Sequence, residues 1–428
     1  MKQLILLFIL FLPGILFSQS CLPDGIIFTT QAEIDSFTIN YPGCSEIEGN
    51  VTINCFNPND ITNLNGLSAI TKIGGTFRII SVPLLENLSG LENLTSIGAG
   101  LSIENTDFLE NLSELGNVTN IGGSIYIDTN HALTSLTGLE SISTINGHLC
   151  LGAGWGWSSN PLLTNFSGLD NVTYIDGDLS ISPSDTISSF SGLENLTVIG
   201  GDLYLKSVHS LVDFTGLSSL TSIGGDVKIF HSNSLISFDG LDNVASIGGD
   251  LKIGSSFFMG NSVLVSLSGL EGLNSIGGRL IIEDNSMLTD ITGIENINAN
   301  SITELAIVNN ISLSSCNVQS ICDFLTSTGG IADIHDNALG CNSKTEVEAS
   351  CGVGINHYNT FQNASIYPNP TNNFLYLDHS KFKDGFEVFI YNIFGVLEKK
   401  TMLSSYKIDL TELTNGVYIL ELKSDNFV

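Results

Sequence analysis

Four aspartates recur at one position of a repeated pattern, and their spacing is the best suited in this sequence to metal binding. Each follows a Gly-Gly or Asp-Gly pair, and successive members are 24 residues apart: Asp178, Asp202, Asp226 and Asp250. If the repeats stack like neighbouring strands, the carboxylates lie about 4.8 Å apart, and a cation such as Ca²⁺ would relieve their repulsion. We favour the interpretation that each carboxylate caps its own turn in solvent, and we expect no cofactor.

Lysines beside this aspartate column raise the question of catalysis. Lys228 and Lys252 each lie two residues after one of the aspartates, and a polysaccharide lyase on a parallel β-helix needs a basic residue and clustered acids in a groove. A ladder of surface charges explains the same residues equally well. The sequence has no HExxH, no GxSxG nucleophile elbow and no phosphate-binding glycine loop, and its histidines share no column. We therefore expect no catalytic residues.

Two insertions into the repeat carry the side chains best suited to hold a ligand. One contains Trp155 and Trp157, the only tryptophans in the chain, and the other contains Phe257, Phe258 and Met259. Both leave the repeat just after a short apolar strand and are four units apart, so stacking would put them on one side, about 19 Å from each other. Aromatic side chains on loops commonly anchor sugars or proteins. The alternative is that each loop buries its aromatics on the adjacent repeat.

Outward-facing strand positions between the insertions include Ser180, Tyr204 and Lys228, with Tyr126 just beyond. We hypothesise that the two loops flank a concave strip that binds an extracellular glycan or a protein. The candidate ligand-binding residues are Trp155, Trp157, Tyr204, Lys228, Phe257, Phe258 and Met259.

These positions depend on a repeat of 24 residues. A leading glycine recurs at 168, 192, 216 and 240, and the two insertions lengthen the steps from 138 to 168 and from 240 to 269 to 30 and 29 residues. Apolar residues within a unit are two or three positions apart, without helical periodicity. The unit from Gly216 has them at Leu217, Leu220, Ile223, Val227, Ile229, Leu235 and Phe238. The pattern predicts an all-β protein with few short helices, built as a parallel β-solenoid over residues 51–310.

Residues 1–20 are typical of a secretory signal peptide. Met1-Lys2 precedes the apolar run from Leu4 to Phe17, and Ser18-Gln19-Ser20 supplies small residues for cleavage. This run is too short for a confident membrane span, and no later stretch is long enough. We therefore expect a protein that is secreted or held at the outer cell surface, without a transmembrane segment.

The charge agrees with export and excludes one class of partner. The formal net charge is −30, and an acidic surface of this kind repels phosphate backbones, so no nucleic-acid partner is expected. Eight cysteines in an exported protein favour disulfides over metal sites.

Residues 21–50 depart from the repeat and are predicted to cap its first end. Thr30 and Glu33 form a capping-box pattern, and a helix strapped by a Cys21–Cys44 disulfide would cover the open end. The first strand is expected at 47–53. The segments CLPDG and NYPGCSEIEGNVTI, followed by units such as SGLENLTVIGGDLYL, resemble the receptor L-domain, a relative of leucine-rich repeats. The resemblance implies a right-handed solenoid with a disulfide-bonded N-terminal cap.

Residues 311–352 are predicted to cap the other end, with short helices at 318–325 and 344–349. Four cysteines allow three pairings, and we favour Cys316–Cys341 and Cys322–Cys351 because each pair is about one coil apart. Cys55 and Cys150 remain as free thiols near coil surfaces.

A linker at 353–364 is followed by a different domain at 365–428. Alternating strands and Asn-Gly turns predict a small Ig-like β-sandwich. The motifs YPNPTNNFLYL, YNIFG and LTNGVYIL resemble the C-terminal sorting domain of type IX secretion in Bacteroidetes. The resemblance implies export by that machinery, followed by removal of the domain and release or surface attachment. Members of that family usually have a further strand and a basic end, so we expect either that this domain is truncated or that its sorting signal is impaired.

The sequence thus predicts a non-enzymatic recognition or adhesion protein on a repeat scaffold. The alternatives are a polysaccharide lyase-like enzyme and a purely structural surface spacer.

Overall fold

The structure is a computed structural model of the chain, and it describes residues 19–55, 60–152, 160–257, 259–328, 330–352, 366–367, 373–377, 387–402 and 407–423. The chain divides into two compact units, Met1–Gly352 and Val353–Val428. The leader predicted at 1–20 and the linker predicted at 353–364 fall almost entirely outside the described residues.

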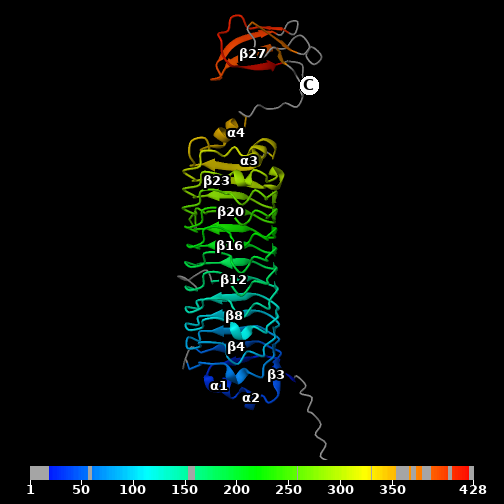
Figure 1. Cartoon of the computed structure of the whole chain (residues 1–428), viewed down its shortest axis with the longest axis vertical. Helices are drawn as coiled ribbons and strands as arrows, with labels where there is room; N and C mark the ends of the chain where they lie inside the picture. Colours follow the sequence, from blue (N-terminus) through cyan, green and yellow to red (C-terminus); the bar gives the residue numbers. More distant parts are fainter. Residues whose placement is uncertain are drawn as a thin grey trace, which may run out of the picture. The chain divides into compact units, whose positions relative to one another are not determined.

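The first unit is a parallel β-solenoid in which each repeat forms one coil, which confirms the predicted fold (Figure 1). One long sheet of thirteen strands runs along it, and each strand except the two at its ends pairs in parallel with a strand of the coil before and of the coil after. Its strands are β2 Ile26–Phe28, β4 Val51–Asn54, β6 Phe77–Ile80, β8 Leu101–Glu104, β10 Ile125–Asp128, β12 Leu149–Leu151, β14 Leu179–Ile181, β16 Leu203–Lys206, β18 Val227–Phe230, β20 Leu251–Ile253, β22 Leu280–Glu283, β23 Glu304–Val308 and β24 Ile331–His335.

Two narrower parallel sheets form a second side of the coils. The first holds β1 Gln19–Cys21, β3 Cys44–Ile47, β5 Lys72–Ile73, β7 Ser96–Ile97 and β9 Asn120–Ile121. The second holds β11 Thr144–Ile145, β13 Tyr174–Ile175, β15 Val198–Ile199, β17 Ser222–Ile223, β19 Ser246–Ile247 and β21 Ser275–Ile276. Single turns of 3₁₀ helix occupy the third side in some coils, at Asn65–Leu67, Ser113–Leu115 and Thr292–Ile294. A further turn at Ala299–Ser301 continues the second side in the coil after β21.

The core is one continuous apolar column inside the coils. All seven apolar positions predicted for the unit from Gly216 are buried, because alternate strand residues point inward. At one of these positions Phe166, Phe190, Phe214 and Phe238 stack with nearly parallel rings, 5.2–5.6 Å between centroids. Stacked apolar columns stabilise every coil only through its neighbours.

The polar residues that recur in the repeat form hydrogen bonds with backbone groups. In the coil that begins at Gly192, Glu194 accepts a hydrogen bond from the N–H of that glycine at 2.8 Å. The Asn195 side chain donates to the carbonyl of Asp170 in the preceding coil at 2.8 Å, and Thr197 donates to the carbonyl of Thr173 at 2.9 Å. The side-chain amide nitrogen of Asn195 is therefore already hydrogen-bonded. The Asn-x-Thr triplet at 195–197 follows from the residues that the repeat needs for these bonds.

Buried side chains form a hydrogen-bonded ladder where the chain turns away from the long sheet. Asn261, Asn285, Asn310 and Asn337 stack in successive coils. The Oδ1 atoms of the last three accept from the backbone N–H of the asparagine before them, at 2.9–3.0 Å, and that of Asn261 accepts from the N–H of Ser232 at 2.9 Å. The Asn285 amide also donates to the carbonyl of Ile253 at 3.0 Å. Burial without these partners would be costly, so the ladder fixes asparagine at this position.

The N-terminal end is closed by short helices, as predicted. α1 Gln31–Asp35 begins at the Thr30 N-cap with a complete capping box, and α2 Phe37–Asn40 follows it. A Cys21–Cys44 disulfide holds this end. The prediction of one first strand at 47–53 was wrong, because the chain turns a corner at Glu48–Asn50 and separates β3 from β4.

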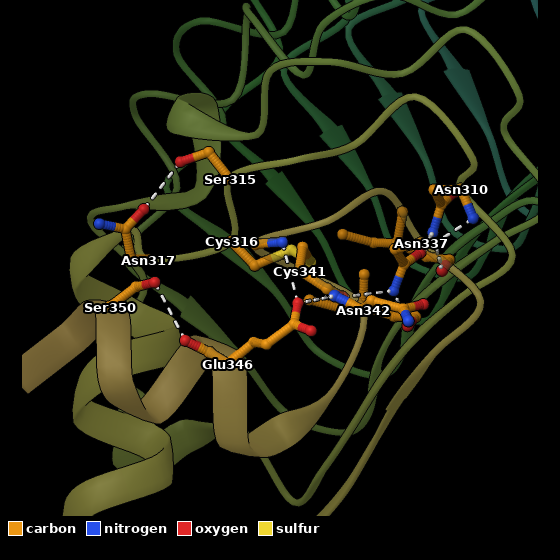
Figure 2. Close-up of a disulfide and its surroundings, with 12 residues drawn as sticks. Asn310, Ser315, Cys316, Asn317, Asn337, Cys341, Asn342, Glu346 and Ser350 are labelled. Atoms are coloured by element: carbon orange, nitrogen blue, oxygen red, sulfur yellow. Dashed lines mark hydrogen bonds between the residues drawn. A yellow bond between two sulfur atoms is a disulfide. The ribbon is translucent and has the colours of Figure 1, made fainter.

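The C-terminal end is closed by α3 Gln319–Asp323, a π-helical turn at Phe324–Thr328 and α4 Lys344–Gly352. The disulfides Cys316–Cys341 and Cys322–Cys351 are the two pairings that we favoured. Figure 2 shows Glu346, near the start of α4, reaching back to this cap. Its carboxylate accepts from the backbone N–H groups of Gly340 at 2.8 Å and Asn342 at 3.0 Å.

The second unit has two three-stranded antiparallel sheets, consistent with the predicted sandwich. Their strands are β25 Ile366–Tyr367, β26 Phe374–Leu377 and β29 Lys407–Asp409, and β28 Leu397–Met402, β27 Glu387–Asn392 and β30 Tyr418–Lys423. Its small core contains Leu375, Val388, Ile390 and Ile408. The strand β28 was not predicted, since its sequence LEKKTM is largely solvent-exposed and lacks the apolar alternation of a half-buried strand.

The asparagine ladder predicts a local loss of stability in the substitution Asn285→Leu. Leucine fills the site but leaves the N–H of Asn261 buried without its partner and removes one hydrogen bond to the carbonyl of Ile253, which should lower the free energy of unfolding by about 2 kcal/mol. Hydrogen exchange should speed up in the coils around β20–β23 first. The matched surface change Asn243→Leu removes only an exposed bond to Ser218 and should have little effect. Equal effects of the two changes would contradict the role of the ladder.

Candidate functional site

The outward-facing residues of the long sheet form a straight column, which we call the exposed column. Strand pairing aligns its central members in order: Thr52, Arg78, Ser102, Tyr126, Cys150, Ser180, Tyr204, Lys228 and Lys252. Their side chains differ from coil to coil, unlike the repeated residues that bond the backbone. This variation on a fixed scaffold makes the column the main candidate surface for ligand binding.

The two insertions leave the solenoid after β12 and β20, four strands apart in the sheet. Trp155, Trp157 and Phe258 lie outside the described residues. Phe257 and Met259 are 83% and 61% exposed, so these two side chains are not buried on the adjacent coil. The backbone carbonyl of Met259 accepts from the N–H of His231 at 3.2 Å, which ties the far end of the insertion to the coil of β18.

A polar hollow of about 430 Å³ lies beside the second insertion. Its lining includes Ser255, Ser256, Met259, His231, Asn233, Asp284 and Asn309. Burial, together with the nearby His209 and Lys206, lowers the pKa of His231, so this ring is neutral at neutral pH. The hollow therefore offers a neutral imidazole, hydroxyl and amide groups and the Asp284 carboxylate next to the exposed ring of Phe257.

Tyr204 lies between the insertions and is half-buried in the exposed column. Its ring meets Phe230 of the next coil edge-on, with 6.2 Å between the centroids. Burial raises the pKa of Tyr204, although the charge of Lys228 opposes this, so the phenol remains a hydrogen-bond donor at neutral pH. A fixed aromatic ring with a hydroxyl suits contact with a sugar or a protein.

The aspartate column links each coil to the next. The N–H of Asp202 donates to Oδ1 of Asp178, that of Asp226 to Asp202, and that of Asp250 to Asp226, each at 2.7 Å. The expectation that each carboxylate caps its own turn was therefore wrong in one respect, because the capped N–H belongs to the following coil. The second corner glycine fits this bond closely: a Cβ on Gly225 would lie 2.2 Å from Oδ1 of Asp202.

Basic side chains occupy the outer oxygens of these carboxylates. The Lys228 ammonium lies 2.8 Å from Asp202 and 2.7 Å from Asp226, which is where we considered a calcium ion. Although burial opposes it, hydrogen bonding to both aspartates raises the pKa of Lys228. Arg279 binds Asp250 through two nitrogens, at 2.9 and 2.7 Å. Among the described residues, no group of three or more His, Cys, Asp or Glu side chains is placed to hold a metal ion.

A second hollow was not predicted and lies in the N-terminal half of the exposed column. Its volume is about 590 Å³, and we call it the notch; its lining is Asn50, Thr52, Thr76, Arg78, Gly100, Leu101, Ser102, Glu104, Ser124 and Tyr126. Gly100 stands where four later coils have the capping aspartate. The sequence signal that could have predicted the notch is glycine at this position in place of aspartate, which is visible only when the repeats are aligned.

Neither unpaired cysteine is a reactive surface thiol. Cys55 is fully buried, which corrects our placement near a coil surface, and its sulfur accepts from the N–H of Asp60 at 3.1 Å. Cys150 is part of the exposed column, but burial and then the charge of Asp178 raise its pKa to about 11. The Cys150 thiol is therefore protonated at neutral pH and is a weak nucleophile.

Comparisons with known proteins identify two segments. Residues 365–428 match the secretion system C-terminal sorting domain, and residues 43–100 match the receptor L domain. No curated protein matches the chain. The sorting domain assigns the protein to type IX secretion, with a destination at the cell surface or outside the cell. Within the described residues, no helix is long and apolar enough to cross a membrane.

The Asp250–Arg279 pair predicts a pH-dependent effect of Asp250→Asn. Burial alone would raise the pKa of Asp250, but hydrogen bonds and charge from Arg279 outweigh burial and lower it below its ordinary 3.8. The carboxylate therefore stabilises the fold above that pH, and the stabilisation is lost as pH falls through the folded-state pKa.

Asparagine keeps the cap on the Arg279 N–H but removes the charge, so the variant should be less stable than wild type by about 1 kcal/mol at pH 7. The difference should shrink as the pH falls below 3.8. Urea unfolding at a series of pH values measures both quantities, and a difference that stays constant with pH would contradict the assignment.

Proposed function

We propose that the protein is a non-enzymatic recognition protein that acts at the cell surface or outside the cell. In this proposal the solenoid is a rigid scaffold, and the ligand lies along the exposed column between the two insertions. The sorting domain delivers the scaffold to the exterior, where an extracellular glycan or protein is the available class of ligand.

The observation that carries the proposal is that repeated residues and variable residues have different roles. Repeated side chains such as Glu194, Asn195 and Asp202 are bonded to the backbone of their own or a neighbouring coil. The exposed column and the insertions are not required by the repeat, yet they carry Tyr126, Tyr204 and Phe257. Exposed aromatic side chains on a rigid face are the usual anchors of an interface.

An enzyme remains a second candidate, and one observation weighs against it. A polysaccharide lyase needs a base that can accept a proton from the sugar, and Lys228 and Lys252 were the residues considered for that role. The Lys228 ammonium is bound by two carboxylates, which hold its proton in place and weigh against this lysine as the base. Assays of purified protein for reducing-end release from acidic polysaccharides separate this candidate from a binding protein.

The binding strip is tested by Tyr204→Ala, Phe257→Ala and the double variant. Each single change should weaken binding of partners found on glycan and protein arrays by about fivefold or more, because each removes an aromatic anchor. The thermal melt of Phe257→Ala should hardly change, since Phe257 is exposed. Tyr204→Ala loses a half-buried ring that packs on Phe230, so its melt should fall slightly while remaining cooperative.

Tyr174→Ala is the matched control for these variants. Tyr174 is also an exposed strand tyrosine, but it lies in β13 of the narrow sheet. Full binding by the double variant would overturn the proposed strip, and a wild-type protein with no array partner would favour the structural spacer.

Export is tested by removing residues 365–428. The truncated solenoid should accumulate in the periplasm of the producing bacterium, whereas the full chain should reach the surface or the medium. The solenoid has its own core, so the shortened protein should fold, and its melt provides the control. Appearance of folded, truncated protein outside the cell would contradict the role of the sorting domain.

A further inference from the structure

We propose that the notch binds a sugar unit of an uncharged glycan. This inference rests on the proposed function, because it assumes that the exposed column faces ligands. It concerns a different part of the column from the strip between the insertions, and it names the chemical class of the ligand.

The notch exists because small residues interrupt the exposed column and its border. Ser102 lies between Arg78 and Tyr126 in the paired strands, so two long side chains stand on either side of a short one. Gly100 removes a further side chain directly before β8. The resulting volume of about 590 Å³ falls within the range of roughly 300–1,000 Å³ that is usual for small-molecule sites.

The floor of the notch lacks a cap that neighbouring coils have. The N–H of Thr76 is capped by Asn50 at 2.8 Å, and that of His148 by Ser124 at 3.0 Å. Gly100 has no side chain, so it cannot cap the corresponding N–H of Ser124, which lines the notch. A backbone donor left without its cap is a site for a ligand oxygen.

The charged groups of the notch favour an uncharged ligand. Arg78 and Glu104 form an ion pair with 3.8 Å between Nη2 and Oε1, and Ser102 donates to the same carboxylate oxygen. One positive and one negative group leave the lining neutral, so a carboxylated sugar would meet Glu104 and an amino sugar would meet Arg78. Sugar hydroxyls both donate and accept, and they can bind this pair together with the Ser124 N–H.

Tyr126 supplies the apolar contact that a sugar ring needs. Its side chain is 43% exposed and forms one wall of the notch. The C–H face of a pyranose can pack on an aromatic ring while the hydroxyls at its edge reach polar groups. Because the notch opens on a sheet face rather than inside the solenoid, one unit of a longer chain can occupy it.

The experiment titrates the full solenoid with six hexasaccharides by calorimetry. Five are uncharged, built from cello-, malto-, manno-, xylo- and N-acetylchito-units, and one is hexagalacturonate. We expect an uncharged hexasaccharide to bind. Tyr126→Ala should weaken that binding by about tenfold, and Gly100→Asp should abolish it.

Gly100→Asp restores the residue of the later coils, whose carboxylate would cap the Ser124 N–H and fill the floor. A Cβ at position 100 would lie 2.9 Å from the backbone carbonyl oxygen of Ser124, so the backbone there must shift and the melt should fall slightly. A cooperative melt with the wild-type circular dichroism spectrum separates blocked binding from misfolding. Should this variant unfold, Tyr126→Ala at an unchanged melt still decides the question. Tyr174→Ala should bind as wild type does.

The notch inference is overturned if no uncharged hexasaccharide binds, if hexagalacturonate binds more tightly, or if Tyr126→Ala binds unchanged. Failure of the notch is distinguishable from failure of the proposed function. If Tyr204→Ala and Phe257→Ala lose an array partner while the notch binds no sugar, only the notch inference fails. Retention of hexasaccharide binding by those two variants supports a separate site.

Discussion

Backbone hydrogen bonding from coil to coil is the interaction on which this structure depends. It places every residue directly above its counterpart in the preceding repeat, so each position of the repeat becomes a column. A column must then be filled with side chains that tolerate contact with copies of themselves. Leucine and phenylalanine meet this demand by packing, and asparagine meets it by accepting and donating in the same direction along Asn261, Asn285 and Asn310.

Aspartate meets the same demand in a less obvious way. A stack of carboxylates would repel, but here Oδ1 of each one faces a backbone N–H, and Lys228 and Arg279 neutralise outer oxygens. The same arrangement explains why an acidic residue repeated in successive coils is a weak indicator of calcium in a solenoid. Chemistry in such a scaffold is better sought where a column changes, as it does at Gly100 and at the two insertions.

Much of the fold could be predicted because the same residue types recur at the buried positions and turns of every coil. The Thr30 capping box and the buried positions from Leu217 to Phe238 follow from local patterns. Predictions were wrong or incomplete where the determining contact comes from another coil. The partner of Asp202 is 24 residues away, and the corner at Glu48–Asn50 divides what looks like one strand. The notch was not predicted because it depends on the missing side chain at Gly100, whereas the candidate sites were predicted from side chains that are present.

The close fit between an aspartate and the glycine of the next corner has a consequence for how such proteins change length. Gly225 accommodates Asp202, and the same coil presents Asp226 to Gly249. A coil of this type therefore has a glycine that fits the aspartate of the coil before it and an aspartate that fits the glycine of the coil after it. A duplicated copy would fit between its neighbours without further substitutions. Gene segments encoding whole coils can be gained or lost in this central stretch, which changes the distance between the two insertions in steps of one strand spacing. Evolution can thus change the distance between the two insertions in fixed increments while the aspartate–glycine contacts between coils stay the same.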